Sequence, residues 1–403
     1  SSMMVLGGLF GYLFQIEIIN YLPESDVSIA ISSISMVVVF GALFSPVSYF
    51  ITKLISKNKS KISNVKLLLE RFVMHKNNQY FFIAISFLFY IFAFYSLNLN
   101  QLNLIMLTLI FISTIPFIII YSTMQGMHLF LTLGIYGLSV NFLKILFLFL
   151  LVFLLTEKLS IFSFLNIIFL SSLLTIFGFY SYLHFKYFKK NISLKNNKTI
   201  QLSIFHKENI RPTVINFSFL LWQNFDILLC SYFLEPLYAK TYIISSVIGK
   251  GIIFASISLT TMVYPMLLAN KETTKAFNSQ LLFLSISIIM LIGFSFAIIL
   301  YFFSESLLSF FYLSFDSSSI FILSMYGFVL LPYLIINIVE HFALADDKLF
   351  YSWVLIPLIF LVFLICMFSK INTFDVLFIY GFVGIVSLIL GSIFFLRSFK
   401  CKQ

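Results

Sequence analysis

Ile244-Ser245-Ser246-Val247 repeats Ile31-Ser32-Ser33-Ile34 at an offset of 213 residues. A second pair of segments follows in the same order, because Pro332-Tyr333-Leu334-Ile335-Ile336 repeats Pro116-Phe117-Ile118-Ile119-Ile120 at an offset of 216 residues. Isoleucine and leucine are common in this chain, so one short match could arise by chance. Two matches in the same order and at nearly the same offset indicate a chain made of two related halves.

The composition is that of a membrane protein. Hydrophobic residues make up 61% of the chain and charged residues only 10%, whereas soluble domains contain about 25% charged residues. Apolar stretches of about 17–25 residues, the length that crosses a bilayer as a helix, predict twelve spans. They lie near residues 4–22, 27–52, 79–98, 102–125, 129–156, 161–187, 211–233, 239–268, 277–302, 319–344, 350–369 and 376–396. The stretches are continuously apolar rather than alternating, which favours helices over barrel strands.

These spans predict an all-α, polytopic bundle with two pseudo-symmetric lobes of six helices. The expected lobes are residues 1–188 and 211–403, and a basic, asparagine-rich cytoplasmic linker at 189–210 separates them. Many transporters are built from two such repeats, which rock about a central binding site. The repeat therefore points to transport.

The distribution of lysine and arginine predicts the orientation. With a cytoplasmic N-terminus, twenty of the basic residues fall on the inner side and three on the outer side, as the positive-inside rule requires. Both termini are then cytoplasmic. The same basic residues account for the net charge of +10, so this charge is no sign of a nucleic-acid partner and we expect none. We expect the chain to lie in a lipid bilayer.

Five ionisable residues fall well inside the predicted spans, where a charge costs about 2.5–3.5 kcal/mol on insertion scales and normally faces protein or water. They are Glu17, Lys144, Asp226, Lys250 and Glu340, and His341 follows the last of them.

The two lysines are the first candidates for substrate binding. Gly134, Gly137, Asn141 and Lys144 are spaced i, i+3, i+7 and i+10, so they form one stripe on a helix. Lys250 lies at a similar depth in the second half. Two central ammonium groups predict a positive cavity, whose natural counter-ion is phosphate. The alternative is that each lysine pairs with an acid and serves packing alone.

A second stripe consists of Asn216, Phe219, Gln223 and Asp226. Asp226 and the corresponding acid of the first span, Glu17, could couple a proton or sodium ion or form hydrogen bonds with a sugar. The alternative is an ion pair between Asp226 and a cavity lysine.

Three other residues are candidates for coupling an ion. Glu17, near the outer end of the first span, is one. Glu340 and His341 are the others, but they also fit a pair that snorkels to the membrane surface.

Enzyme motifs are absent from the sequence. It contains no GxGxxG, P-loop, HExxH or GxSxG pattern, and its three cysteines show no metal or disulfide spacing. We therefore expect no catalytic residue, no metal, and no cofactor apart from a coupling H⁺ or Na⁺.

The start of the second half carries a resemblance to a known family. It reads Asn224-Phe225-Asp226-Ile227-Leu228-Leu229, then Tyr232-Phe233-Leu234-Glu235-Pro236, Gly249-Lys250 and Tyr264-Pro265-Met266. This order resembles the Wzx-type polysaccharide flippases of the multidrug/oligosaccharidyl-lipid/polysaccharide (MOP) exporter superfamily. One departure is that the family usually has more residues ahead of the first span.

The resemblance implies a flippase in the bacterial cytoplasmic membrane. Its substrate would be an undecaprenyl-diphosphate-linked oligosaccharide, such as an O-antigen or capsule repeat unit, moved from the inner to the outer leaflet by alternating access. Lys144 and Lys250 would hold the diphosphate, and Asn141, Asn216, Gln223 and Asp226 would contact sugar hydroxyls or couple an ion. Polysaccharide polymerase or assembly machinery would be its partner. One alternative is a cation-coupled drug exporter of the same superfamily. Another is a membrane glycosyltransferase that binds a metal ion through Glu24 and Asp26.

Overall fold

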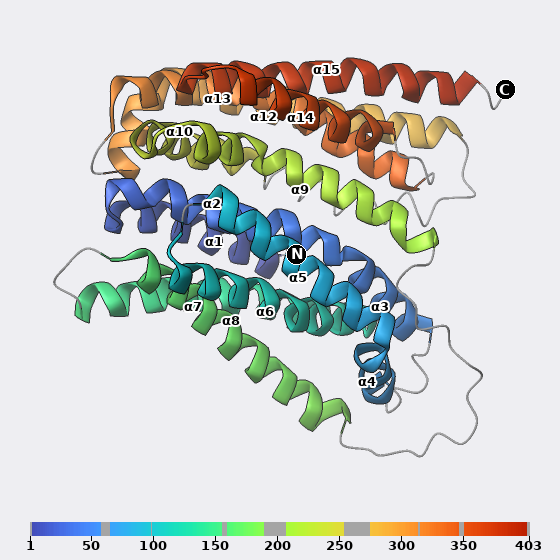
Figure 1. Ribbon diagram of the computed structural model, residues 1–403. Helices are drawn as coiled ribbons and strands as arrows, with labels where there is room; N and C mark the ends of the chain where they lie inside the picture. Colours follow the sequence, from blue (N-terminus) through green and yellow to red (C-terminus); the bar gives the residue numbers. More distant parts are fainter. Residues whose placement is uncertain are drawn as a thin grey trace. The chain divides into compact units, whose positions relative to one another are not determined.

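The structure is a computed structural model that describes residues 2–57, 65–97, 99–154, 159–188, 207–253, 275–312, 315–345 and 350–400 (Figure 1). Every regular element within these ranges is a helix, and the ranges contain no strand. The predicted all-α class is confirmed. Lipid offers no partners to backbone N–H and C=O groups, and a helix satisfies these groups within its own segment.

The described residues of the first half of the chain form helices of up to 26 residues. They are α1 (Ser2–Tyr21), α2 (Glu24–Gly41), η1 (Ala42–Phe44), α3 (Ser45–Lys57), α4 (Val65–Met74), α5 (Lys76–Ser96), α6 (Gln101–Gly126), α7 (Phe130–Leu154), α8 (Ile161–Leu183) and the π-helical turn η3 (His184–Phe188).

The described residues of the second half also form helices. Its helices are α9 (Lys207–Phe233), α10 (Pro236–Gly249), α12 (Lys275–Phe311), α13 (Ser317–Ala345), α14 (Phe350–Phe368) and α15 (Thr373–Lys400). The helix α12 has non-helical backbone angles at Phe303.

Nine helical segments among the described residues are long and apolar enough to cross a membrane, and each matches a predicted span. A shorter apolar segment, Ser352–Phe368, matches a tenth. The other two predicted spans coincide with α1 and with α10, although residues 254–268 of the latter span lie outside the described residues. The chain is a multi-pass membrane protein.

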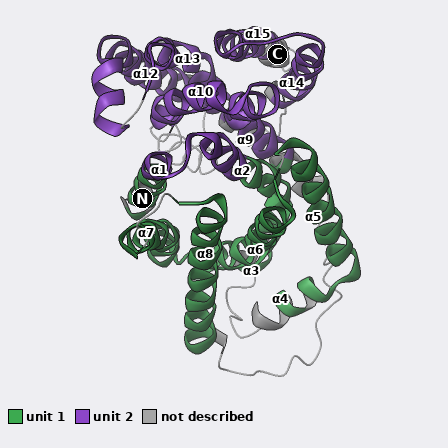
Figure 2. Ribbon diagram, turned by 60° about the vertical axis from the view of Figure 1, so that its left-hand side comes forward, with its two compact units in different colours: residues 1–14, 36–213 green, residues 15–35, 214–403 purple. Residues whose placement is uncertain are grey.

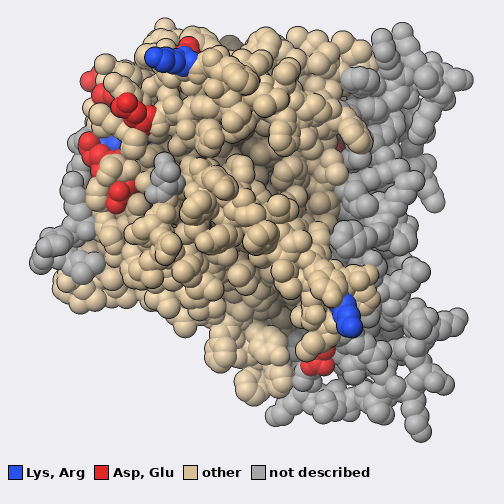
Figure 3. Space-filling model, viewed as in Figure 1, with Lys and Arg blue, Asp and Glu red and all other residues tan. Residues whose placement is uncertain are grey.

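The surface of the described residues fits contact with lipid. Large apolar side chains point outward from the middle and ends of several helices; Phe177 of α8, for example, is 74% exposed. On the face drawn in Figure 3, the described charged side chains gather mainly along the left edge and at the lower right, and residues of other types make up the broad surface between them.

By their internal contacts the residues form two compact units (Figure 2). Unit 1 comprises Ser1–Phe14 and Met36–Thr213, and unit 2 comprises Gln15–Ser35 and Val214–Gln403. The end of α1 and the start of α2 therefore group with the second half of the chain. Most of the predicted linker, at 189–206, lies outside the described residues, so the predicted lobe boundaries stay a prediction.

Within unit 1, α6 packs against both α3 and α8. A buried apolar cluster includes Ile51 of α3, Met124 of α6, Tyr136 of α7 and Leu183 of α8. Between helices that both lie in lipid, burial of apolar surface supplies little driving force, so close packing holds such a core together.

Within unit 2, α13 is the central helix. It packs along α12 and also against α10 and α15. The repeated serines of the two halves are alike in being fully buried. They are Ser32 and Ser33 of α2 and Ser245 and Ser246 of α10. In α10 they face α13, since Ser245 Oγ donates to the carbonyl of Ser319 at 2.7 Å.

Candidate functional site

Four polar side chains form a buried cluster in unit 2, which we call the Asp226 cluster: Asp226 on α9, Ser246 and Lys250 at the end of α10, and Tyr326 on α13. The ammonium of Lys250 lies 2.7 Å from Oδ1 of Asp226. The hydroxyl of Ser246 donates to Oδ2 at 3.0 Å, and the hydroxyl of Tyr326 donates to the same oxygen. The side chain of Asp226 is fully buried and that of Lys250 is 14% exposed. Both carboxylate oxygens therefore have partners, and the carboxylate charge is neutralised.

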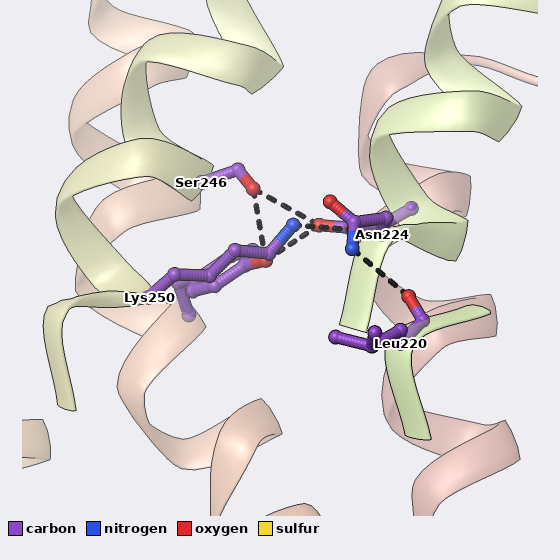
Figure 4. Close-up of polar contacts among 6 residues, drawn as sticks. Leu220, Asn224, Ser246 and Lys250 are labelled. Carbon is purple, nitrogen blue, oxygen red and sulfur yellow. Dashed lines mark hydrogen bonds and ion pairs between the residues drawn. The ribbon is translucent and has the colours of Figure 1, made fainter. Parts of the chain in front are cut away.

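The local sequence explains how α10 supplies two of these groups. Ser246 and Lys250 are one helical turn apart, so both reach toward α9 from the same face of α10 (Figure 4). Asn224, on the facing part of α9, donates instead to the carbonyl of Leu220 at 2.9 Å. Between the two α10 residues, Gly249 makes room for Tyr326, because a Cβ at Gly249 would overlap with Cδ1 of the tyrosine ring.

The sequence predicted Asp226 and Lys250 as separate candidates, and the structure brings them together. Their pairing is the alternative that the sequence left open. Tyr326 was not predicted, although a tyrosine in the middle of a span carries a hydroxyl that needs a partner inside the protein. The position of this hydroxyl in the middle of a span could therefore have identified Tyr326 from the sequence.

Aromatic rings surround the Asp226 cluster. Tyr326 stacks on Tyr380 with ring centroids 6.1 Å apart, and Tyr380 stacks on Tyr333 at 4.9 Å. Trp222 of α9 lies against Tyr333 in turn. All four rings are buried, so the cluster borders a tightly packed part of unit 2.

The other predicted residues of α9 are placed differently. Asn216 and Gln223 are half-buried, and the side chain of neither forms a hydrogen bond with another described residue. Their role in binding sugar hydroxyls stays a prediction.

Lys144 lies in the middle of α7, in unit 1. Its ammonium donates to Oδ1 of Asn141 at 3.1 Å and lies 5.9 Å from the ring centroid of Phe14. Asn141 in turn donates to the carbonyl of Gly7 on α1 at 2.8 Å. The two helices approach closely, since a Cβ at Gly7 would lie 3.1 Å from the backbone nitrogen of Leu138. Among the described residues no carboxylate pairs with Lys144, so its positive charge is not neutralised there.

Glu340 lies near the end of α13 and is buried, with 3% of its surface exposed. It accepts a hydrogen bond from Ser352 of α14 at 3.1 Å, and Ser352 contacts Ser218 of α9 at 2.8 Å. The snorkelling alternative does not fit this burial. The neighbouring His341 is helical, but its side chain lies outside the described residues.

Glu17 is half-buried on α1 and pairs with no other described residue. One turn later, Asn20 donates to the carbonyl of Phe311 at 2.9 Å. Glu17 therefore remains a candidate for ion coupling.

Glu24 and Asp26, the acidic pair of the glycosyltransferase alternative, have other partners. Glu24 forms an ion pair with Lys240 of α10 at 2.6 Å, and Asp26 accepts a hydrogen bond from Ser25. Within the described part of the chain, no group of three or more His, Cys, Asp or Glu side chains could hold a metal ion. This geometry does not favour the glycosyltransferase alternative.

Comparisons with known proteins bear on the fold. No protein-family model matches the chain, and no curated protein matches it either. Solved structures do match it over almost its full length. The lipid II flippase MurJ in an inward closed conformation has a TM-score of 0.63 at 14% identity, covering 97% of this chain and 87% of that one. A MATE transporter in a bent conformation has a TM-score of 0.60 at 13% identity, covering 97% and 92%.

A further match is a MOP superfamily transporter from Pyrococcus furiosus, described as having a binding pocket of reverse polarity. Its TM-score is 0.55 at 12% identity, and the match covers all of this chain and 95% of that one. The chain has the fold of a MOP superfamily transporter. Proteins with this MOP fold include both multidrug transporters and a flippase, so the fold alone leaves the substrate open.

Proposed function

We propose that the chain is a MOP-fold flippase for an anionic, lipid-linked oligosaccharide. The substrate class is an undecaprenyl-diphosphate-linked glycan, moved from the inner to the outer leaflet of the bacterial cytoplasmic membrane. The two halves would expose the binding site alternately to each side, driven by an H⁺ or Na⁺ gradient. Support comes from the MOP fold, from a lipid II flippase among the structural relatives, and from the environment of Lys144.

The observation that carries the proposal is the lysine without a carboxylate partner. An ammonium group in the middle of a span is costly unless it faces water or a partner. Among the described residues, Lys144 has only an amide oxygen and an aromatic ring. A diphosphate group would supply the missing negative charge and several strong hydrogen-bond acceptors. Lys250 would contact a substrate only if its ion pair with Asp226 opened.

The ion that drives transport would bind elsewhere than at Lys144. Glu17 and Glu340 are the acids available for it, because neither pairs with a basic side chain among the described residues. Polysaccharide polymerase or assembly machinery would receive the product on the outer side.

The binding proposal is tested by native mass spectrometry of the purified protein with undecaprenyl diphosphate and with uncharged undecaprenol. The wild-type protein should prefer the diphosphate. Lys144→Met keeps the apolar stem and removes the charge, so diphosphate binding should fall at least ~10-fold, which corresponds to one charge-assisted hydrogen bond. Lys144→Arg should retain most of it.

Lys186→Met is the matched control. Lys186 is exposed at the end of its helix and bonds to Tyr182, so the same change of residue type there should leave diphosphate binding unaltered. A Lys144→Met protein that binds both lipids as the wild type does would contradict the proposed site.

A drug exporter is the second candidate function, and the half-buried Glu17 favours it, because a carboxylate without a counter-charge suits a cationic drug. The binding assay separates the two functions when rhodamine 6G replaces the lipid. A flippase should not bind the cationic dye. Dye binding that is lost in Glu17→Gln would favour the exporter.

A further inference from the structure

We propose that the carboxylate of Asp226 is a binding site for a small cation. The ammonium group of Lys250 occupies this site in the native chain. In the native chain neither sodium nor a proton from solution binds at Asp226. Such a site appears only when Lys250 is removed. The inference concerns the ion held by Asp226, so it is independent of the transported substrate.

The geometry of the Asp226 cluster leaves no room for a second cation. Oδ1 of Asp226 is held by the ammonium at 2.7 Å, and Oδ2 accepts hydrogen bonds from Ser246 and Tyr326. The side chain is fully buried. An ionised carboxylate inside a membrane protein requires a counter-charge, because water does not reach it. The tethered ammonium provides that charge permanently.

Among the described residues, the surroundings of Asp226 offer no substitute for Lys250. Apart from Lys250, the described titratable side chains that interact with Asp226 are one thiol and four phenols, all neutral at physiological pH. They are Cys230 on α9, Tyr242 on α10, Tyr326 and Tyr333 on α13, and Tyr380 on α15. Among the described residues, Lys250 is the single cation that pairs with this carboxylate. Without it, the carboxylate must take up sodium or a proton.

A second lysine–carboxylate pair in the same unit provides a matched control. Lys240 and Glu24 lie 2.6 Å apart, but the side chain of Glu24 is 53% exposed. Removing the ammonium there leaves a carboxylate with access to solvent, which needs no replacement ion.

The experiment compares wild-type protein, Lys250→Met, Lys240→Met and the double variant Asp226→Asn/Lys250→Met. The apparent unfolding temperature of each purified protein is measured at a fixed heating rate. Sodium chloride is varied from ~1 to ~300 mM against choline chloride at constant ionic strength, and pH is varied from ~6 to ~9. The cation is thus the only variable in each series.

Lys250→Met should gain at least ~2 °C more than the wild type with added sodium or with falling pH, because a cation that binds only the folded state stabilises it. Any response of the wild type itself would come from the acids proposed to couple the ion, and Lys240→Met should share that response unchanged. The double variant should lose the additional response, since its neutral amide needs no counter-ion.

Two results would overturn the proposal. One is a wild-type response to sodium or pH that the double variant abolishes, which would mean that solution cations reach Asp226 beside Lys250. The other is a folded Lys250→Met protein whose response to sodium and to pH equals that of the wild type. If Lys250→Met does not accumulate as folded protein, recovery by the double variant supports an unpaired carboxylate as the cause, and failure to recover contradicts it.

Discussion

Three lysines inside or beside the spans have different environments. Lys250 faces a buried carboxylate, Lys144 faces an amide oxygen and an aromatic ring, and Lys186 reaches a tyrosine hydroxyl at an exposed helix end. The cost of an intramembrane charge depends on what it contacts. The first lysine is therefore a structural charge, the third reaches the surface, and the second is the one of the three that has a positive charge available for a ligand.

Gly249 is the residue on which the geometry of the Asp226 cluster depends. A Cβ at this position would overlap with the Tyr326 ring, so Gly249→Ala must push Tyr326 away from Asp226. We expect a loss of about 1–3 kcal/mol of stability from overpacking, measured as a lower apparent unfolding temperature.

Gly178→Ala on α8 is the control for that substitution. A Cβ at Gly178 meets nothing within 4 Å, so the change should be neutral or stabilise the helix by up to about 1 kcal/mol. Equal destabilisation by the two alanines would contradict a specific role of Gly249.

At the scale of the element, α13 begins at a well-defined cap. Asp316 precedes its first residue and accepts hydrogen bonds from the backbone N–H and the hydroxyl of Ser319, at 2.9 and 2.7 Å. Its other oxygen accepts from Thr241 of α10 at 3.2 Å. The cap therefore fixes the start of α13 and ties it to α10, which carries half of the Asp226 cluster.

Replacing this cap should weaken the helix. Asp316→Ala removes the acceptors of three hydrogen bonds, and we expect a loss of about 0.5–2 kcal/mol, the range measured for helix N-caps. The apparent unfolding temperature at neutral pH measures it. Ser317→Ala, at an exposed residue of the same turn, should change stability by less than about 0.5 kcal/mol.

The same cap gives a pH dependence. Burial raises the pKa of Asp316, but the hydrogen bonds from Ser319 and Thr241 outweigh it and hold the pKa below its ordinary value. A depressed pKa means that the stabilisation is present above the unfolded-state pKa of about 3.9 and is lost as pH falls through the folded-state value. The difference in unfolding temperature between wild type and Asp316→Ala should therefore shrink below pH ~4. A difference that stays the same size as pH falls below the unfolded-state pKa would contradict this account.

The elements themselves could be predicted from the sequence, because hydropathy and helix length are local properties. The span predicted at 319–344 is α13, Ser317–Ala345. The neighbours of each helix are not local. The stripe on α9 gave the depth and the face of Asp226, but nothing in it indicated that α10 would bring Lys250 within 2.7 Å. The sequence therefore predicted the same role for Lys144 and Lys250, whereas in the structure Lys250 has a carboxylate partner and Lys144 has none among the described residues.

At the scale of the whole molecule, the two repeats do not coincide with the two compact units. Residues Gln15–Ser35, which belong to the first repeat, form part of unit 2. Two polar contacts hold them there: Asn20 donates to the carbonyl of Phe311, and Glu24 pairs with Lys240. The predicted topology places both contacts at the outer side of the membrane. If the two halves move as proposed, these contacts must open when the outer side opens.

This motion can be tested by a covalent lock. In a variant whose native cysteines, Cys230, Cys366 and Cys401, are replaced by alanine, we expect Glu24→Cys/Lys240→Cys to be joined by a short bifunctional methanethiosulfonate reagent, because the two native side chains touch. The joined protein should lose transport of a fluorescent undecaprenyl-diphosphate oligosaccharide in proteoliposomes. Reduction of the link should restore it.

A lock inside unit 1 distinguishes motion from damage by the reagent. Thr52 of α3 and Gln125 of α6 lie 3.4 Å apart by their hydrogen-bonding atoms, and both belong to unit 1. Thr52→Cys/Gln125→Cys joined by the same reagent should therefore transport as well as its reduced form. Full transport by the Glu24→Cys/Lys240→Cys lock would show that Gln15–Ser35 stays with unit 2 throughout the cycle. In that case the parts that move against each other would be the two compact units. The sequence repeats would then reflect a duplication of the chain and would not coincide with the moving parts.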